Sequence, residues 1–293
     1  MGNVFYMHPK PPYSIRKHLE LFSLGNNPVP CIYSNGVCRR AVRNDRNVLA
    51  FKVKVVSEGF NPCIKVIAIC GNTNEVRKIV EHIYNVNLDY SEFLSTVKNI
   101  PKLYSLALKY LGLRPALTPT LYEALIKAII NQRIPLKIAN AIISRVVRRY
   151  GFKVIFNNEE YYDFPNSNEL AKVNVDELRE LGLSMRKAGF IINISKAVSE
   201  GYDLEALKRE RYEEVISELT KFKGVGLWTA QLAYAASTGD MSVGPEQDLA
   251  VRRGLSLIFR DEKIPNSVWL KYRGLIMYLA SLEYEVRFKA KQL

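Results

Sequence analysis

One carboxylate and one indole lie close together in the sequence, at positions where a turn and a helix start are expected. Residues 221–230 read KFKGVGLWTA, and Asp248 follows within PEQDLAVRRG. A buried carboxylate can stabilise positive charge on a reacting carbon or activate water. An indole offers an electron-rich face to a cation. Each residue alone has a simpler explanation, because Asp248 could cap the next helix and Trp228 could pack in a core.

The glycines between them belong to a turn that joins two predicted helices. ERYEEVISELTKF and LWTAQLAYAAS carry the helical period, and KGVG connects them. Glycine reaches the positive φ of so tight a turn without strain. The free N–H groups from Gly226 onward could bind a phosphate oxygen, and Lys221 and Lys223 would add electrostatic affinity for a polyanion. Such backbone contacts position nucleic acid without reading bases. On the glycines alone, an ordinary helical hairpin that binds nothing remains the alternative.

Two regions of different composition must position these residues. VLAFKVKVVSEGF and CIKVIAICGN are expected strands, and PYSIRKHLELFSLG and TNEVRKIVEHIYN are expected helices. From about Pro101 onward the helical period takes over. We therefore predict an α+β, mostly α fold, with a small antiparallel-sheet domain over residues 1–95. A helical body of two subdomains follows over residues 96–293 and contains the hairpin at about residues 212–237.

Local signals set several helix boundaries. Pro119 suits a first helical turn, and Thr120 with Glu123 has the spacing of a capping box. The next predicted helix turns Ile138 inward. Asp203 is expected to start the last helix before KGVG.

Composition points to a polyanionic partner. The 293 residues carry 42 Lys and Arg against 29 acids, a net charge of +13, which favours nucleic acid over the alternative of a generally basic proteome. No apolar run is long enough to cross a membrane, and the N-terminus lacks the apolar core of a secretory signal. We therefore expect an intracellular, cytoplasmic or nucleoid-associated protein.

The cysteines and histidines give no sign of a metal site. The chain has four cysteines and three histidines: Cys31, Cys38, Cys63, Cys70, His8, His18 and His82. The cysteines lack the spacing of zinc ligands and make a poor disulfide framework, and the histidines form no ligand pair. We expect four free thiols, two of them in strand cores.

The order of helix, glycine turn, helix, loop and aspartate resembles the helix-hairpin-helix superfamily of DNA base-excision glycosylases. Three further segments are similar to that superfamily: YEALIKAIINQRI, PNSNELAKVNVDELRELGLSMRKAGFIINISKAV and YRGLIMYLASL. PPYSIRKHLELFSLG and the strands after it resemble the N-terminal domain of its 3-methyladenine DNA glycosylase II (AlkA-like) branch. The resemblance covers nearly the whole chain.

This resemblance implies a monofunctional glycosylase that flips alkylated bases out of duplex DNA and excises them. Asp248 would stabilise the oxocarbenium-like transition state or activate water, without a metal or organic cofactor. Trp228 stands where strand-cleaving members carry a nucleophilic lysine, and its ring would lie against the extrahelical base.

The resemblance also implies the surrounding contacts. The base pocket would be formed by Trp228, Leu21, Phe22, Tyr234 and Tyr278. The DNA-binding residues would be Gln132, Arg133, Lys221, Lys223, Gly224, Gly226, Thr229 and Arg252. Arg133 would be the wedge that fills the gap left by the flipped base, a position where the AlkA-like branch usually has an apolar side chain.

Two other functions remain open at this stage. One is an enzyme of the same fold that acts on oxidised or deaminated bases, with or without lyase activity. The other is a DNA-binding module without catalysis. The expected partner is damaged double-stranded DNA, and we expect a monomer with no membrane and no obligatory protein partner.

Overall fold

The N-terminal region forms one antiparallel sheet. The structure is a computed structural model that describes residues 2–43, 47–260 and 262–290. The strand order is β1-β5-β4-β3-β2. Alternate residues of the central strand, Phe51, Val53 and Val55, are buried, whereas Lys54 between them is exposed, as the two-residue repeat of a strand requires. The strands are β1 (Asn3–Met7), β2 (Ile32–Ser34), β3 (Val37–Arg43), β4 (Val48–Ser57) and β5 (Cys63–Cys70).

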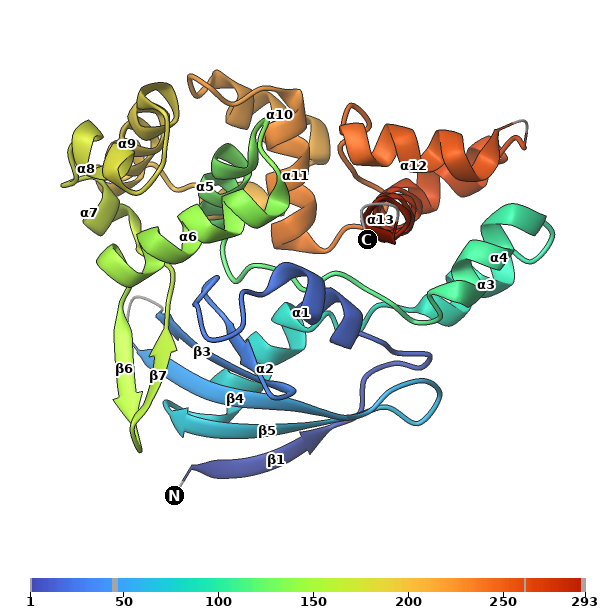
Figure 1. Cartoon of the computed structure of the whole chain (residues 1–293), viewed down its shortest axis with the longest axis horizontal. Helices are drawn as coiled ribbons and strands as arrows, with labels where there is room; N and C mark the ends of the chain where they lie inside the picture. Colours follow the sequence, from blue (N-terminus) through green and yellow to red (C-terminus); the bar gives the residue numbers. More distant parts are fainter. Residues whose placement is uncertain (1, 44–46, 261, 291–293) are drawn as a thin grey trace.

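Helices make up most of the remaining chain and lie on one side of the sheet in Figure 1. This confirms the predicted α+β, mostly α fold. The α-helices are α1 (Arg16–Phe22), α2 (Thr73–Ile83), α3 (Tyr90–Thr96), α4 (Pro101–Lys109), α5 (Leu121–Asn131), α6 (Leu136–Tyr150), α7 (Ser167–Leu170), α8 (Val175–Glu180), α9 (Met185–Ser199), α10 (Tyr212–Lys221), α11 (Leu227–Thr238), α12 (Leu249–Phe259) and α13 (Asn266–Ala290), with a 3₁₀ helix η1 (Glu205–Arg209).

Two helical cores carry the site. Around α5, nine of whose residues are buried, pack α6, α9 and α11. A second core joins residues from Tyr90 to Leu113 with residues from Phe259 to Leu282, so α3 and α4 lie beside α12 and α13 (Figure 1). The division of the chain after residue 95 stays a prediction. The two predicted domains include some residues that lie outside the described ones, namely residues 1, 44–46, 261 and 291–293.

A small hairpin inside the helical half was missed by the sequence analysis. Strands β6 (Lys153–Phe156) and β7 (Glu159–Tyr162) are joined by Asn157 and Asn158, both with positive φ. Asparagine adopts this conformation more easily than other residues with a side chain, so NN between two short β-rich runs was the overlooked signal. β7 packs on β3, where Tyr161 is fully buried.

Other corrections concern the start of α5. Thr120 is the N-cap, and its hydroxyl accepts from the Glu123 N–H at 3.0 Å. Pro119 precedes this cap and is not in the first turn. The Glu123 carboxylate does not complete a capping box, because it pairs with Arg40 of β3 at 2.5 Å, and both side chains are buried. A long-range ion pair therefore replaces the predicted local contact.

Two further helix predictions were wrong. Ile138 is half exposed, because it falls in the first turn of α6 and not on its buried face. Asp203 accepts from the Ala206 N–H and starts only the 3₁₀ helix η1. The α-helix before KGVG begins later, at Tyr212.

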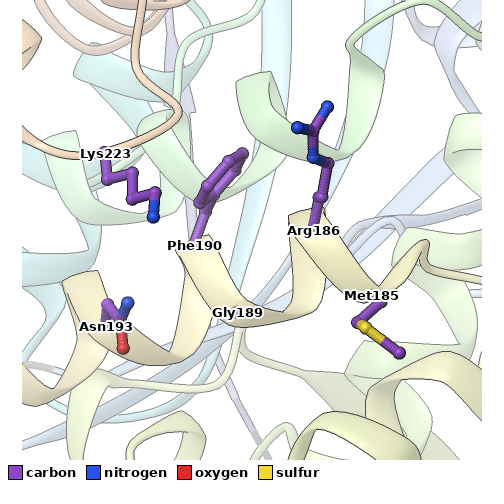
Figure 2. Close-up of a pocket in the computed structure, with 6 residues that line it drawn as sticks. All are labelled: Met185, Arg186, Gly189, Phe190, Asn193 and Lys223. Carbon is purple, nitrogen blue, oxygen red and sulfur yellow. The ribbon is translucent and has the colours of Figure 1, made fainter.

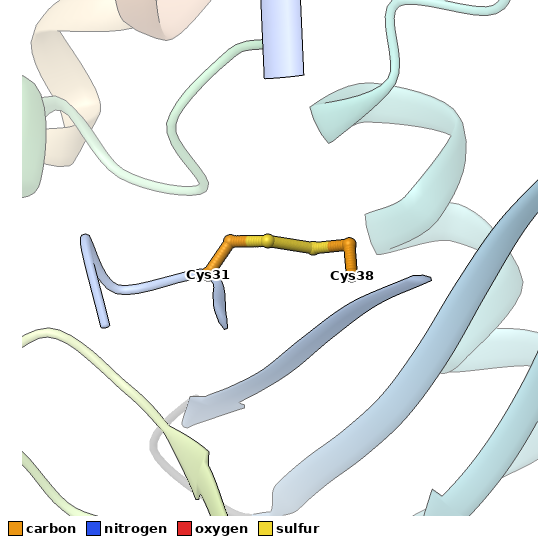
Figure 3. The surroundings of a disulfide bond; sticks show 2 residues. All are labelled: Cys31 and Cys38. Atoms are coloured by element: carbon orange, nitrogen blue, oxygen red, sulfur yellow. A yellow bond between two sulfur atoms is a disulfide. The ribbon is translucent and has the colours of Figure 1, made fainter. Parts of the chain in front are cut away.

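The cysteines also differ from the prediction of four free thiols. Cys31 and Cys38 form a disulfide across the β2–β3 hairpin (Figure 3). Antiparallel pairing of the two strands brings the Cα atoms of the two cysteines to within 6.0 Å of each other, which their sequence spacing of seven did not reveal. Cys63 and Cys70 are free and stand at the two ends of β5. Cys63 is partly exposed and Cys70 is exposed, so neither is a core residue.

The helices of the described ranges include none with the length and apolar character that a membrane crossing requires.

Candidate active site

Asp248 is held by contacts to both of its carboxylate oxygens. Oδ1 accepts from the N–H groups of Ala250 and Val251 at 2.9 and 3.1 Å, which makes Asp248 the N-cap of α12. Oδ2 accepts from Nε1 of Trp228 at 3.0 Å. The capping role and the candidate site role are therefore compatible, because capping occupies one oxygen and fixes the direction of the other. Asp248 and Trp228 are each partly exposed.

The glycine turn between α10 and α11 has a different role for each glycine. Gly224 has a φ of +89°, and a Cβ at this position would lie 2.1 Å from a ring carbon of Phe190. Gly226 has an ordinary φ of −93° and is the N-cap of α11, where no side chain bonds the first amides. Gly224 thus makes the turn possible, and Gly226 leaves the helix N-terminus open.

We expect Gly224→Ala to lower the free energy of unfolding by about 1–3 kcal/mol, from left-handed strain and the clash with Phe190. The matched control is Gly189→Ala inside α9, where a Cβ would meet nothing within 4 Å. Helix propensity predicts a gain of about 0.5–1 kcal/mol there. Denaturant unfolding of both variants checks this, and equal stabilities would contradict the assigned role of Gly224.

The end of α5 is tied to the turn. The Gln132 side-chain amide donates to the Gly224 carbonyl and to the Thr229 hydroxyl, both at 2.9 Å. Lys187 Nζ donates to the carbonyls of Ile130 and Gln132 at 2.8 and 2.6 Å, which satisfies free carbonyls at the end of the helix. Sequence reasoning missed Lys187, although it lies in the quoted GLSMRKAGF segment. These contacts bring three separate segments together.

Arg133 follows Gln132 directly. It has a φ of 54°, which is uncommon for a residue with a side chain, and it is exposed. Within the ranges that the structure describes, no carboxylate pairs with its guanidinium. Its role as a wedge stays a prediction, and its position beside the Gln132 contacts is consistent with that role.

The predicted base-pocket residues fall into separate groups. The Phe22 ring stacks on His18 with centroids 4.3 Å apart, and His18 Nδ1 is hydrogen-bonded to the Tyr278 hydroxyl at 2.9 Å. Leu21, like Phe22 and Tyr278, packs against the core that joins α3 and α4 to α12 and α13. Tyr234 is instead buried in the core around α5, and Trp228 contacts Asp248.

His18 is a buried neutral ring. Burial, and to a lesser extent the charge of Lys127, lowers its pKa from 6.5 to about 3. Below about pH 6.5 His18 therefore binds a proton in the unfolded chain but not in the folded protein. As the pH decreases from about 6.5 to about 3, the free energy of unfolding decreases by up to about 1.4 kcal/mol per pH unit.

We expect His18→Gln to remove this dependence. The difference in unfolding free energy between wild type and variant should shift in favour of the variant as the pH falls from 6.5 to 4.5. Chemical denaturation at several pH values measures this, and a difference that does not change with pH would contradict a buried neutral His18.

The predicted cations differ in their contacts. Lys221 is paired with Glu218 at 2.5 Å. Lys223 and Arg252 are exposed and have no carboxylate partner among the residues that the structure describes. Thr229 is buried and accepts from Gln132, so its contact is internal. No group of three or more His, Cys, Asp or Glu in the described ranges is arranged to hold a metal ion.

Comparisons with known proteins agree with this geometry. Residues 126–269 match the model of the HhH-GPD superfamily of base excision DNA repair proteins. DNA-3-methyladenine glycosylase 1 of Schizosaccharomyces pombe is 34% identical over 151 residues, 51% of this chain and 62% of that protein. DNA-3-methyladenine glycosylase of Bacillus subtilis is 27% identical over 157 residues, 53% of this chain and 52% of that protein. The matches thus span about half to three fifths of these relatives.

A solved structure extends the similarity to the N-terminal sheet. The 3-methyladenine DNA-glycosylase from Archaeoglobus fulgidus superposes with a TM-score of 0.81 and 29% identity, over 94% of this chain and 97% of that one. The matched family model includes α10, the glycine turn, α11 and Asp248, which are the elements of the candidate site. The matched region, residues 126–269, belongs to the HhH-GPD superfamily of base excision DNA repair proteins.

Proposed function

We propose that this protein is a monofunctional DNA glycosylase that excises alkylated bases, chiefly 3-methyladenine and related methylated bases, from duplex DNA. The observation that carries the proposal is the contact between Trp228 and Asp248 at the start of α12. Further support comes from the family membership, from the relatives named 3-methyladenine glycosylases and from the net charge of +13.

A single carboxylate suffices for this reaction because of the charge on the substrate. Alkylation of a purine ring nitrogen makes the base cationic, so it leaves with the C1′–N bonding pair as a neutral molecule and needs no protonation. The sugar carbon becomes positive, and the Asp248 carboxylate stabilises it. Water then attacks C1′ and gives its proton to the carboxylate or to solvent. Among the residues that the structure describes, Oδ2 accepts one hydrogen bond, so it keeps a lone pair for this step.

Trp228 contributes in two ways. Its N–H fixes the carboxylate, and an indole face attracts a cationic base more strongly than a neutral one. Tryptophan has no nucleophilic nitrogen, so the enzyme would leave an abasic site and would not cut the strand.

The contacts of the wider site follow from the same proposal. The N-terminal amides of α11 bind backbone phosphates, Arg133 fills the stack after base flipping, and Phe22 and Tyr278 lie at the base pocket. The enzyme acts as an intracellular monomer of two domains divided near residue 95.

A panel of duplexes tests the proposal. Each contains one lesion, either a cationic methylated purine or a neutral oxidised or deaminated purine, and is treated with or without borohydride. We expect base loss from the methylated purine and no trapped adduct. Preferred action on the neutral lesions, or a covalent protein–DNA adduct, would contradict the proposal. Binding without base loss from any lesion would support a non-catalytic module instead.

A further inference from the structure

A pocket lies beside the hairpin, on the surface of α9 (Figure 2). It has a volume of about 470 Å³, and its lining consists of Met185, Arg186, Gly189, Phe190, Asn193 and Lys223. We propose that this pocket is an additional DNA site, which binds one phosphodiester of a DNA strand outside the phosphates held by the hairpin. The inference rests on the proposed function only in requiring that the protein binds duplex DNA.

The charge of the pocket favours a phosphate. Figure 2 shows Arg186 and Lys223 extending to the same side of α9 as the Phe190 ring. In the part of the chain that the structure describes, neither cation has a carboxylate partner, in contrast to Lys221, which pairs with Glu218. An arginine fork and an ammonium together match the oxygens of one phosphodiester.

The shape of the pocket leaves room for a sugar and a phosphate. At Gly189 a Cβ would meet no atom within 4 Å, so the middle of the helix surface is open. Met185 is 62% exposed and, with the Phe190 ring, provides an apolar surface for a deoxyribose. The Asn193 amide makes no hydrogen bond within the described residues and can donate to a phosphate oxygen.

The pocket is continuous with the hairpin. Phe190 lines it and also lies against Gly224, the glycine that makes the turn. Lys223 lines it and directly precedes that glycine. DNA held at the amides of α11 would therefore pass close to the pocket, and this continuity favours DNA over a separate acidic peptide as the occupant.

Duplex binding at several salt concentrations tests the inference, with Arg186→Ala beside a control. Lys54→Ala is the matched control, because Lys54 is an exposed cation on β4 without an ion pair in the described structure. We expect Arg186→Ala to weaken binding about 3- to 10-fold near 0.1 M salt. The slope of log affinity against log salt concentration should become shallower by about the amount that corresponds to one lost phosphate contact. Lys54→Ala should change neither quantity. Arg186→Lys should recover part of the affinity, and circular dichroism confirms that each variant is folded.

A scan of single uncharged methylphosphonates along both strands locates the contact. In wild type, we expect one position outside the hairpin phosphates to weaken binding, and this loss should disappear in Arg186→Ala. Equal behaviour of the Arg186 and Lys54 variants, or a scan that Arg186→Ala leaves unchanged, would overturn the inference. An Arg186-dependent interaction with an acidic peptide, with duplex affinity unchanged, would also overturn it.

Both readouts use binding and not base release. A wild-type protein that binds duplex but releases no base would refute the proposed function and leave this test interpretable. A protein that binds no duplex would refute both.

Discussion

Asp248→Asn is expected to lower the single-turnover rate of base excision about 10³-fold, with duplex affinity within about twofold of wild type. The substitution keeps the size of the side chain but removes its charge. The amide oxygen can still accept from Ala250 and Val251, so the cap of α12 is retained. The amide nitrogen then faces the Trp228 N–H, and two donors cannot bond. The variant therefore loses both the charge at the sugar and the contact that orients it.

Asp240→Asn is the matched control for this variant. Asp240 is another partly buried aspartate, in the loop between α11 and Asp248, and it accepts from the N–H and hydroxyl of Ser242 at 2.8 and 2.6 Å. We expect it to retain excision within about threefold, because it touches no reacting atom. Equal rates for the Asp248 variant and wild type would refute the catalytic assignment, and equal losses in both variants would indicate a general disturbance of the loop.

Arg114→Met is expected to lower the free energy of unfolding by about 3–5 kcal/mol, the largest stability effect that we predict. Arg114 is fully buried, and all five of its N–H groups donate to backbone carbonyls. Its partners are the carbonyls of Lys10, Pro12, Asn85, Leu88 and Gly112. The guanidinium also lies 4.6 Å from the centre of the Tyr13 ring. Methionine fills a similar volume but supplies no donor to these carbonyls.

Arg114→Lys should cost less than the methionine variant, but still more than about 1 kcal/mol, because lysine has three donors and no planar fork. Burial lowers the pKa of Arg114 to about 10, so its guanidinium is still charged at neutral pH and a charged group is buried in the folded protein. Arg179→Met is the control. Arg179 pairs with Asp176 in an exposed i,i+3 contact, and its loss should change stability by less than about 0.5 kcal/mol. Similar stabilities for the Arg114 and Arg179 variants in denaturant unfolding would contradict this account.

Local signals in the sequence predicted the parts of the fold that depend on neighbouring residues. Thr120 caps α5, Gly224 makes the turn and Asp248 starts α12, as expected from spacing alone. The mostly helical fold with a small sheet is also confirmed. The residues of the candidate site were named from the resemblance, and their catalytic roles stay predictions. What the structure adds is the hydrogen bond that joins Trp228 to Asp248 across 20 positions.

Contacts between distant segments could not be predicted in this way. Glu123 was expected to bond its own helix start, but the buried Arg40 of β3 offers a stronger partner. Arg114 and Lys187 look like ordinary surface cations in the sequence, because their partners are backbone carbonyls of other segments. The disulfide depends on strand pairing that the spacing of the cysteines does not reveal. The β6–β7 hairpin is short, and its burial depends on β3.

The most direct test of the central claim is chromatography of what wild-type protein releases from methylated duplex DNA. Our account predicts free 3-methyladenine or a related methylated base in solution, together with a duplex that carries abasic sites in unbroken strands. Intact duplex binding with no free methylated base would contradict it. Strand cleavage through a covalent adduct would contradict the role assigned to Trp228.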